Sequence, residues 1–375
     1  MDPRYDVAVI GVGSMGASAC FSLAVRGLRV LGLEQFGIPN ELSSHAGQTR
    51  IIRKAYFEDA AYVPLLESSY AGWKQLEAKA GEQIYFETGL LYQGPAQHPV
   101  IEGVLHSARK HGISLREGRA ACGPHFQFHN SSVCLFEPEA GYLLPDRAIS
   151  CFTRLARHAG ANIRSHEVVL SWNKTGNEFR IETKRGVYHS ARLVITAGAW
   201  TAKICPSLNE HLRITRQLLG WMDVDDPEQY LPDRFPCWMI ASKNFPGVLY
   251  GFPYMEAEPK GLKAALHFPG EVCDPDTVNR EVSSKEQDEL LSLVRGCLPG
   301  VTRIRETKVC LYANSPDENF ILDFVPGYEG AAVMACGFSG HGFKFVPVVG
   351  DILTDLVEKG ETNHPIEFLR LARLK

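Results

Sequence analysis

Three glycines near the start of the chain have the spacing of a dinucleotide-binding turn. They form the pattern G-x-G-x-x-G directly after an apolar run at 6–10, and a second apolar run at 31–33 ends in an acid. The first glycine of such a pattern allows a tight turn, the second lets the backbone approach a pyrophosphate, and the third lets the next helix pack closely. The helix N-terminus would direct its N–H groups at the phosphates, and the acid would accept hydrogen bonds from ribose hydroxyls. The residues expected to hold the cofactor here are Gly11, Gly13, Ser14, Met15, Gly16 and Glu34.

The identity of the dinucleotide follows in part from position 34. An arginine there would suit a 2′-phosphate, so the acid favours FAD or NAD over NADP. The alternative is an ordinary strand–helix–strand unit in which the glycines serve close packing only. The strand, the helix, the second strand and its terminal acid all occur in the required order, which favours dinucleotide binding.

The elements that must position this site are spread along the whole chain. Helical periodicity is expected at 62–80 and 146–158, and apolar strands at 193–200 and 332–336. A last helix is expected at 346–357. Nucleotide-domain patterns therefore occur at both ends of the chain and in its middle. This arrangement predicts a discontinuous nucleotide-binding domain with a second sheet domain inserted into it.

Composition sets limits on the class of protein. The 375 residues suggest about two domains, and 45% hydrophobic with 22% charged residues is ordinary for a globular protein. A net charge of −4 gives no reason to expect nucleic acid or an anionic membrane as a partner, and no apolar run approaches the roughly 20 residues of a membrane span. Ten scattered cysteines form no C-x-x-C pair, so no metal site is expected. Without a secretory signal the expectation is reduced thiols and a cytoplasmic location.

Several further stretches are more specific than the glycine pattern. They are GQTRIIR at 47–53, YGFP at 250–253, GLK at 261–263, CLY at 310–312, SPDE at 315–318 and GFSGHGFK at 337–344. With them, nearly the whole chain resembles the monomeric sarcosine oxidase and N-methyltryptophan oxidase family of flavin-dependent amine oxidases, which includes pipecolate/sarcosine oxidase. The resemblance implies an α/β plus α+β fold, in which a Rossmann-like FAD-binding domain carries an inserted antiparallel-sheet catalytic domain. The expected boundaries are 1–84, 146–218 and 306–375 for the FAD-binding domain, and 85–145 and 219–305 for the catalytic domain.

The resemblance implies that FAD is attached covalently through Cys310. A thiolate can add at the methyl carbon of an oxidised, electron-poor flavin, and such a tether would prevent loss of the cofactor. From composition alone, a buried structural thiol would be the alternative for any single cysteine.

Two cations match the pair that holds the substrate carboxylate in this family, Arg53 and Lys344. An arginine suits a carboxylate because its planar fork donates two parallel hydrogen bonds. Lys344 lies between two phenylalanines, an apolar setting in which its charge needs a partner. Without the family, Arg50 and Arg53 would be two cations on one helical turn with a solvated face.

Lys263 matches the family's oxygen-activating lysine. A fixed cation near the flavin would stabilise the superoxide anion that forms when reduced flavin passes an electron to O₂. The alternative is a surface lysine on a strand. Other matches to the catalytic and flavin-contacting positions of the family are Gln48, Thr49, Arg50, Val169, Tyr250, His267, Tyr312, Gly340, His341 and Gly342.

One position departs from the family pattern. Many relatives carry a histidine directly before the glycine of the 47–50 stretch, where this chain has Ala46. His45 lies one residue earlier, and its side chain is expected to point differently. The flavin-face contacts and the substrate preference of relatives therefore need not transfer to this chain.

The leading prediction is a FAD-dependent oxidase of secondary amino acids that produces an imine and hydrogen peroxide. Sarcosine, N-methyltryptophan, pipecolate and proline remain open as substrates, and the protein is expected to be a monomer. One alternative is a dehydrogenase of the same fold that passes electrons to a quinone or a carrier protein. Another is an NAD-binding protein with a sensing or scaffolding role.

Overall fold

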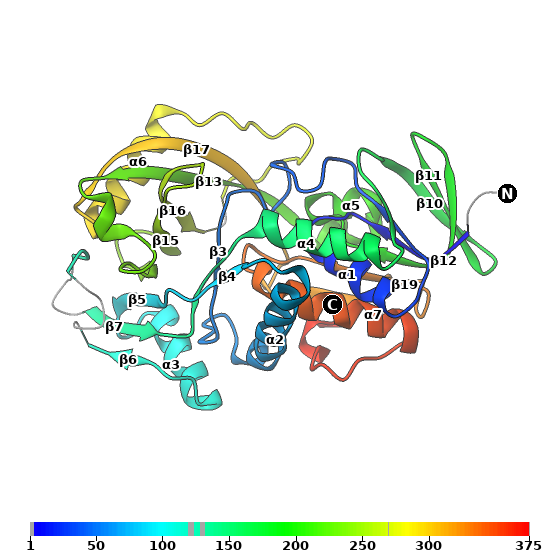
Figure 1. The fold of residues 1–375 in the computed structure, drawn as a ribbon, viewed down its shortest axis with the longest axis horizontal. Coiled ribbons are helices and arrows are strands. Elements are labelled where there is room, and N and C mark those ends of the chain that lie inside the picture. Colours follow the sequence, from blue (N-terminus) through cyan, green and yellow to red (C-terminus); the bar gives the residue numbers. More distant parts are fainter. Residues whose placement is uncertain (1–3, 119–123, 128–131, 269, 375) are drawn as a thin grey trace.

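Two eight-stranded sheets and one three-stranded sheet make up the strand framework of the molecule (Figure 1). The computed structural model describes residues 4–118, 124–127, 132–268 and 270–374. In Figure 1 the sheet that begins with β1 lies on the right and the sheet of β13 to β17 lies on the left. The expected fold class is confirmed, since a Rossmann-like unit is combined with a largely antiparallel sheet.

The first sheet has a parallel core. Five strands run parallel in the order β9, β2, β1, β12 and β19, and the antiparallel β10, β11 and β18 extend it. Strands buried on both faces become continuous apolar runs, which is why β2 and β19 are buried at every position. The strand bounds are Arg4–Ile10 (β1), Val30–Leu33 (β2), Asn162–Arg164 (β9), Val169–Thr175 (β10), Glu178–Thr183 (β11), Val187–Ile195 (β12), Ile321–Phe324 (β18) and Ala332–Cys336 (β19).

Helices cover one face of this sheet and form the largest core of the protein with it. Helix α7 packs on α1 and α2, and α1 also packs on α4 (Figure 1). The expected helices at 62–80, 146–158 and 346–357 are confirmed within a few residues. Their bounds, with that of the glycine-turn helix, are Ser14–Val25 (α1), Val63–Ala80 (α2), Pro145–His158 (α4) and Val346–Lys359 (α7).

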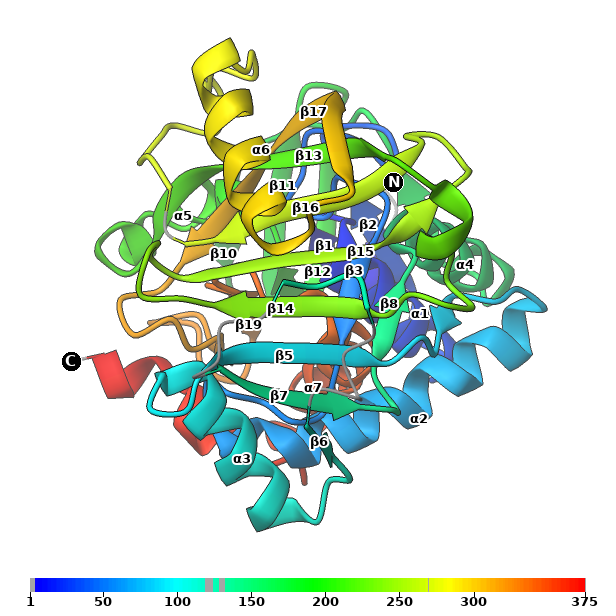
Figure 2. The ribbon, with the colours of Figure 1, turned by 90° about the vertical axis from the view of Figure 1, so that its left-hand side faces the viewer.

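The second sheet is antiparallel except where β14 pairs with β5. Figure 2 shows its strands in the order β17, β13, β16, β15, β14, β5, β7 and β6. Helix α6 (Ser284–Cys297) packs against one part of it and α3 (Pro99–His111) against another. The strand bounds are Leu90–Pro95 (β5), Arg116–Glu117 (β6), Ser132–Glu137 (β7), Arg213–Val224 (β13), Cys237–Ala241 (β14), Val248–Met255 (β15), Gly261–His267 (β16) and Val301–Asn314 (β17).

The small third sheet carries the arginine-rich stretch that follows the glycine-turn unit. Strand β3 (Arg50–Ile52) pairs with β8 (Gly141–Leu143), which also pairs with β4 (Tyr85–Phe86). Arg50 and Arg53 are therefore not two cations on one helical turn, and that alternative is wrong. The backbone of Arg50 is in a strand, and the residue Arg53 is only 2% exposed.

The expected domain boundaries can be placed on these sheets. Positions 218 and 306 fall inside β13 and β17, which pair with each other along almost their whole length in the second sheet. A division by strand pairing would therefore place both strands entirely with the second sheet. The sequence could not indicate this, because a long strand carries no internal mark of the sheet that it joins.

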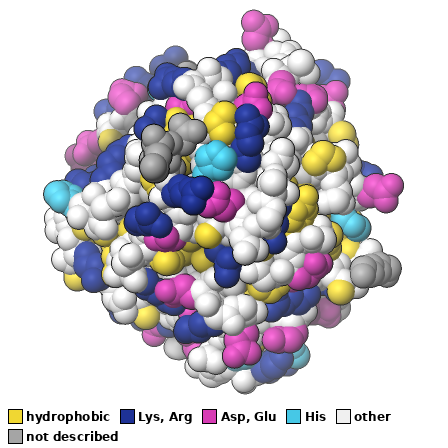
Figure 3. Space-filling view, turned by 90° about the vertical axis from the view of Figure 1, so that its right-hand side faces the viewer, with side chains coloured by type: hydrophobic (Ala, Val, Ile, Leu, Met, Phe, Trp, Pro, Cys, Tyr) yellow, Lys and Arg dark blue, Asp and Glu magenta, His cyan; other side chains and the backbone are white. Residues whose placement is uncertain are grey.

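The described residues also show the character of the helices, the state of the cysteines and the charge on one face of the surface. None of the helices in the described residues is long and apolar enough to cross a membrane. The nine cysteines within the described ranges are all free thiols, and Cys122 lies outside them. Figure 3 shows the face at the right-hand side of Figure 1, on which basic and acidic side chains are interspersed.

Candidate active site

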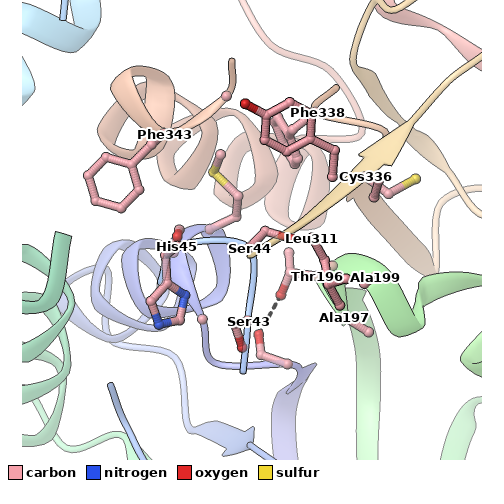
Figure 4. Close-up of a pocket in the computed structure, with 18 of the residues that line it drawn as sticks. Ser43, Ser44, His45, Thr196, Ala197, Ala199, Leu311, Cys336, Phe338 and Phe343 are labelled. Carbon is pink, nitrogen blue, oxygen red and sulfur yellow. Dashed lines mark hydrogen bonds between the residues drawn. The ribbon is translucent and has the colours of Figure 1, made fainter. Parts of the chain in front are cut away.

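A cavity of about 470 Å³ is lined by residues of both eight-stranded sheets. It runs from the glycine turn after β1 to residues of β15, β16 and β17, and the segment after β19 lines it as well. Figure 4 shows separate parts of the chain around this space: Ser43, Ser44 and His45; Thr196, Ala197 and Ala199; Leu311; and Cys336, Phe338 and Phe343. A site assembled from such distant segments depends on the tertiary fold.

At the first end of the cavity, the glycine turn has the geometry that its spacing predicts. Gly11 has a φ of +91°, and a Cβ on it would lie 2.6 Å from the carbonyl oxygen of Thr196. A Cβ on Gly16 would lie 1.9 Å from the carbonyl oxygen of Gly11, so only glycine allows α1 to pack this closely on the strand. Helix α1 has no side-chain cap and no acid in its first turn, which leaves its N-terminal N–H groups for an anion.

Glu34 lies directly after β2 and lines the same end of the cavity. Its carboxylate accepts hydrogen bonds from the N–H of Val12 at 2.9 Å and the N–H of Phe36 at 3.0 Å. Burial raises its pKa, and these N–H groups act in the opposite direction. Two donors leave acceptor capacity on a carboxylate, so Glu34 can also accept hydrogen bonds from ribose hydroxyls.

The chemistry of this donor set fits FAD. The glycine turn and the helix N-terminus suit its pyrophosphate, Glu34 suits its ribose, and Val169 at the start of β10 lines the cavity beside them. The cavity then continues to Cys310. Within the described residues, no group of three or more His, Cys, Asp or Glu side chains could hold a metal ion.

Arg50 and Lys263 hold the loop that precedes β3. The Nζ of Lys263 donates to the carbonyls of Gly47 at 2.6 Å and Thr49 at 2.8 Å, and Lys263 is fully buried on β16. Burial and the nearby Arg50 guanidinium lower the pKa of Lys263 well below its usual value. The alternative of a surface lysine is therefore wrong. The Arg50 guanidinium donates at 2.6 to 3.0 Å to the backbone carbonyls of Ser44, Ala46, Gly47 and Thr49.

The departure at positions 45 and 46 can now be located. The imidazole of His45 lines the cavity, whereas Ala46 is buried and is not among the lining residues within the described chain (Figure 4). The Nδ1 atom of His45 lies 3.6 Å from the place of a Cβ on Gly13, next to the glycine turn. Burial, and then the charge of Arg50, lower the pKa of His45 to about 3, so its imidazole is neutral at neutral pH.

Cys310 lies on β17 opposite Gln217 of β13 and lines the cavity. The residue is 1% exposed, and burial raises the pKa of its thiol. The positive charges of Arg50 and Lys263 act in the opposite direction and favour the thiolate. Cys310 therefore presents a thiol to the cavity, with the Arg50 guanidinium close enough to favour its thiolate form.

Arg53 and Lys344 meet at the other end of the cavity around the ring of Tyr56. The Cζ of Arg53 lies 4.4 Å from the ring centroid and the Nζ of Lys344 lies 5.1 Å from it. Lys344 donates to the carbonyl of His341 at 2.6 Å. Burial, followed by the charge of Arg53, lowers the pKa of Lys344 to about 7.

Sequence reasoning missed Glu58, which lines the cavity beside these cations. One nitrogen of Arg53, Nη2, donates to both of its carboxylate oxygens, at 2.6 and 2.7 Å. Burial alone would raise the pKa of Glu58, but Arg53, His341 and Lys344 together hold it at about 2. No motif marked this acid. The signal available was its position five residues after Arg53, and its meaning depends on the turn between them.

Two neutral histidines lie at the same end of the cavity as Arg53 and Lys344. His341 contacts the hydroxyl of Tyr56 through Nδ1 and the carbonyl of Glu318 through Nε2 at 3.0 Å, so Nε2 carries its proton. His267 Nδ1 lies 3.2 Å from the hydroxyl of Tyr312. Burial lowers the pKa of His341 to about 3 and that of His267 to about 4, so neither adds positive charge at neutral pH.

The positions named from the sequence either line the cavity or support it from behind. A Cβ on Gly340 would lie 2.2 Å from the ring of Tyr312, so the glycine lets the 337–344 segment lie against that ring. Residues that line the cavity are Gly11, Gly13, Ser14, Met15, Glu34, Arg50, Arg53, Val169, Tyr250, His267, Cys310, Tyr312, Gly340, His341, Gly342 and Lys344. Residues that support it from behind are Gly16, Gln48, Thr49 and Lys263, of which Gln48 accepts a hydrogen bond from the Trp221 indole at 2.9 Å.

Comparison with known proteins identifies a matching family and several similar proteins. Residues 6–356 match the model of a family described as FAD dependent oxidoreductase. Monomeric sarcosine oxidase of Streptomyces avermitilis is 36% identical over 383 residues, which cover 100% of this chain and 99% of that protein. N-methyl-L-tryptophan oxidase of Salmonella arizonae is 33% identical over 376 residues, which cover 99% of each chain.

Similar solved structures support the fold. NikD, an unusual amino acid oxidase essential for nikkomycin biosynthesis, has a TM-score of 0.85 at 23% identity, covering 98% of this chain and 97% of that one. L-proline dehydrogenase from P. horikoshii has a TM-score of 0.84 at 21% identity, covering 100% and 98%. The chain belongs to the monomeric sarcosine oxidase and N-methyl-L-tryptophan oxidase family of FAD-dependent oxidoreductases, which act on amine CH–NH bonds.

Proposed function

We propose that this protein is an oxidase of secondary amino acids, either N-methyl or cyclic, that uses O₂ as electron acceptor. Sarcosine, N-methyltryptophan and pipecolate are the candidate substrates. The observation that carries the proposal is the pair of buried cations, Arg53 and Lys344, in the same cavity as the glycine turn and Cys310. An anionic group on the substrate would compensate their charge, and the relatives named for sarcosine and N-methyltryptophan act on such amino acids.

The substrate carboxylate binds between Arg53 and Lys344. Glu58 accepts two hydrogen bonds from Nη2 of Arg53 and the carbonyl of Ala55 accepts one from Nη1, which leaves the Nε–H and the second N–H of Nη1 for the substrate. The Lys344 ammonium has three donors and uses one of them on the carbonyl of His341. The charges of Arg53, Lys344 and Glu58 add up to a net charge of +1 when Lys344 is protonated. A single substrate carboxylate balances this charge.

The amine is held near the neutral side chains of the other cavity wall. His267, Tyr312 and Tyr250 line it, and burial raises the pKa of Tyr250 to about 12, so both tyrosines stay protonated. A neutral imidazole can accept a proton, and His267 is neutral above about pH 4. Removing the amine proton frees the nitrogen lone pair for oxidation of the adjacent C–H bond.

When bound, FAD would supply the two-electron acceptor for this oxidation, with O₂ as the final acceptor. Two electrons and two protons leave the substrate as the amine becomes an imine, and O₂ takes up both to give hydrogen peroxide. Lys263 provides a buried positive charge behind the 47–49 loop when it is protonated, which favours formation of an anionic oxygen species. Cys310 holds the cofactor covalently through a thioether, and the protein acts as a monomer.

A dehydrogenase that passes electrons to a quinone or carrier protein is the second candidate. The position of Lys263 favours it, since both of its close hydrogen bonds go to backbone carbonyls and, within the described chain, it does not line the cavity. Burial also lowers its pKa, which favours the uncharged amine. The two candidates differ in how the reduced flavin reacts with O₂.

The test is the flavin absorbance of the purified protein after anaerobic mixing with each candidate amino acid, followed by air. Bleaching by one amino acid and rapid recovery in air, with hydrogen peroxide formed in equal amount, is the expected result. Bleaching with slow recovery would replace the oxidase by the dehydrogenase. No bleaching with any secondary amino acid would refute the proposed substrate class.

A further inference from the structure

Glu137 is a buried acid that the proposed reaction does not use. It is the last residue of β7, is 0% exposed, and does not line the cavity as far as the described residues show. A buried carboxylate is costly unless its oxygens receive hydrogen bonds, so its partners indicate what it does. Those partners are all at or beside the stretch that follows Arg53.

The carboxylate of Glu137 holds the backbone directly after Arg53. Its Oε1 accepts a hydrogen bond from the N–H of Lys54 at 2.6 Å, and both oxygens lie 3.3 Å from the N–H of Ala55. The hydroxyl of Tyr92 on β5 donates to Oε2 at 2.7 Å. The two N–H groups lie just beyond the last residue of β3, so Glu137 satisfies donors that a turn would otherwise leave buried.

The same turn fixes the guanidinium of Arg53. The carbonyl of Ala55 accepts a hydrogen bond from Arg53 Nη1 at 3.2 Å, while the N–H of Ala55 faces Glu137. The Tyr92 hydroxyl also lies 3.3 Å from that carbonyl. Burial raises the pKa of Glu137 and the charge of Arg53 acts in the opposite direction, so the two groups are close enough to interact. One residue, Ala55, thus connects the acid outside the cavity to the cation inside it through its N–H and its carbonyl.

We propose that Glu137 is a positioning residue for the substrate carboxylate: it fixes the turn at 53–55, and the turn directs the Arg53 guanidinium into the cavity. The inference rests on the proposed function, since it takes Arg53 as the group that binds the carboxylate. An arginine that is already held in its binding geometry loses less side-chain freedom when the substrate arrives. Loosening the turn should therefore weaken the recognition of a carboxylate more than any other interaction of the ligand.

The test compares two substrate mimics that carry an ether oxygen in place of the amine. One has a carboxylate and the other has an uncharged amide in the same position. Methoxyacetate replaces the nitrogen of sarcosine by oxygen, and methoxyacetamide has the same shape without the negative charge. Their affinities are measured from the change in flavin absorbance of the FAD-loaded protein. The quantity that reports on the clamp is the ratio of the two dissociation constants.

Glu137→Gln is the informative variant, because glutamine has nearly the same shape and keeps one acceptor for the N–H of Lys54. We expect it to reduce the preference for the acid about tenfold and to raise KM for the amino acid more than it changes kcat. Tyr92→Phe removes one hydrogen bond to the same carboxylate and should act in the same direction with a smaller effect. Glu77→Gln is the matched control: Glu77 Oε1 accepts from the N–H groups of Ile84 at 2.7 Å and Tyr85 at 2.8 Å, away from Arg53.

The outcomes separate this inference from the proposed function. If the unmodified protein does not prefer methoxyacetate to methoxyacetamide, the carboxylate clamp is refuted and this inference with it. If it does, but Glu137→Gln keeps that preference or weakens both ligands equally, Glu137 supports only the fold and the inference is refuted. An equal loss of preference in Glu77→Gln would refute it too.

Discussion

The affinity for a carboxylate should fall as pH rises through neutrality, because one of the two cations of the clamp titrates there. The pKa of Lys344 is about 7, lowered from 10.5 by burial and by the neighbouring Arg53. The other groups around it keep their charge over this range. Glu58 is ionised above about pH 2, and the two histidines His341 and His267 are neutral above about pH 3 and 4. Burial acts against the charge of Arg53, but Glu58 outweighs it and raises the pKa of Arg53, which stays charged.

The size of the effect follows from the fraction of Lys344 that is protonated. If only the ammonium form binds the carboxylate, affinity is highest below the pKa and declines tenfold for each pH unit above it. At about pH 9, two units above the pKa, the dissociation constant should have risen about 100-fold, which corresponds to about 2.7 kcal/mol. The bound anion raises the pKa of the lysine in the complex, so the decline extends across this whole range.

The assay is the titration of flavin absorbance with methoxyacetate at steps from about pH 5 to about pH 9, a range in which this ligand remains an anion. Lys344→Met keeps the length of the side chain without the charge. It should bind the anion more weakly and show no change in affinity with pH. A flat profile in the unmodified protein, or an unaltered slope in Lys344→Met, would refute the assignment of the titrating cation to Lys344.

Three other changes test separate parts of the site. Lys263→Met should slow reoxidation of the reduced flavin in air and spare its reduction by substrate, and stopped-flow measurement showing equal loss in both half-reactions would remove the proposed role in oxygen activation. Cys310→Ser should release FAD into the supernatant when the protein is denatured by acid, whereas the unmodified protein should keep it; release from both would show that the tether does not form. Gly16→Ala would place a Cβ 1.9 Å from the carbonyl oxygen of Gly11, so it should lower the free energy of unfolding by more than about 3 kcal/mol and reduce the FAD content, and a normal melting temperature would contradict that packing.

The sequence predicted the elements whose patterns are local. The glycine turn, helix α2 and strand β19 follow from residue types at fixed spacing, because backbone freedom and apolar periodicity act over a few residues. The length of β13 and β17 was not predictable in the same way. Their pairing joins residues from Arg213 and Asn314 at one end to Val224 and Val301 at the other, far apart in the sequence, and no local pattern states which sheet a strand will enter.

The chemistry of the site shows the same division. The resemblance to the amine oxidase family implied that the residues at positions 53 and 344 bind a carboxylate, that the residue at 263 stabilises an oxygen anion and that the residue at 310 holds the flavin. Only the tertiary structure decided their surroundings. Glu58 lies against Arg53, Lys263 lies behind the 47–49 loop, and Glu137 holds the turn at 53–55. Burial and the distances between charges set the pKa values and the free donors of these groups, and both depend on which distant segments meet in space.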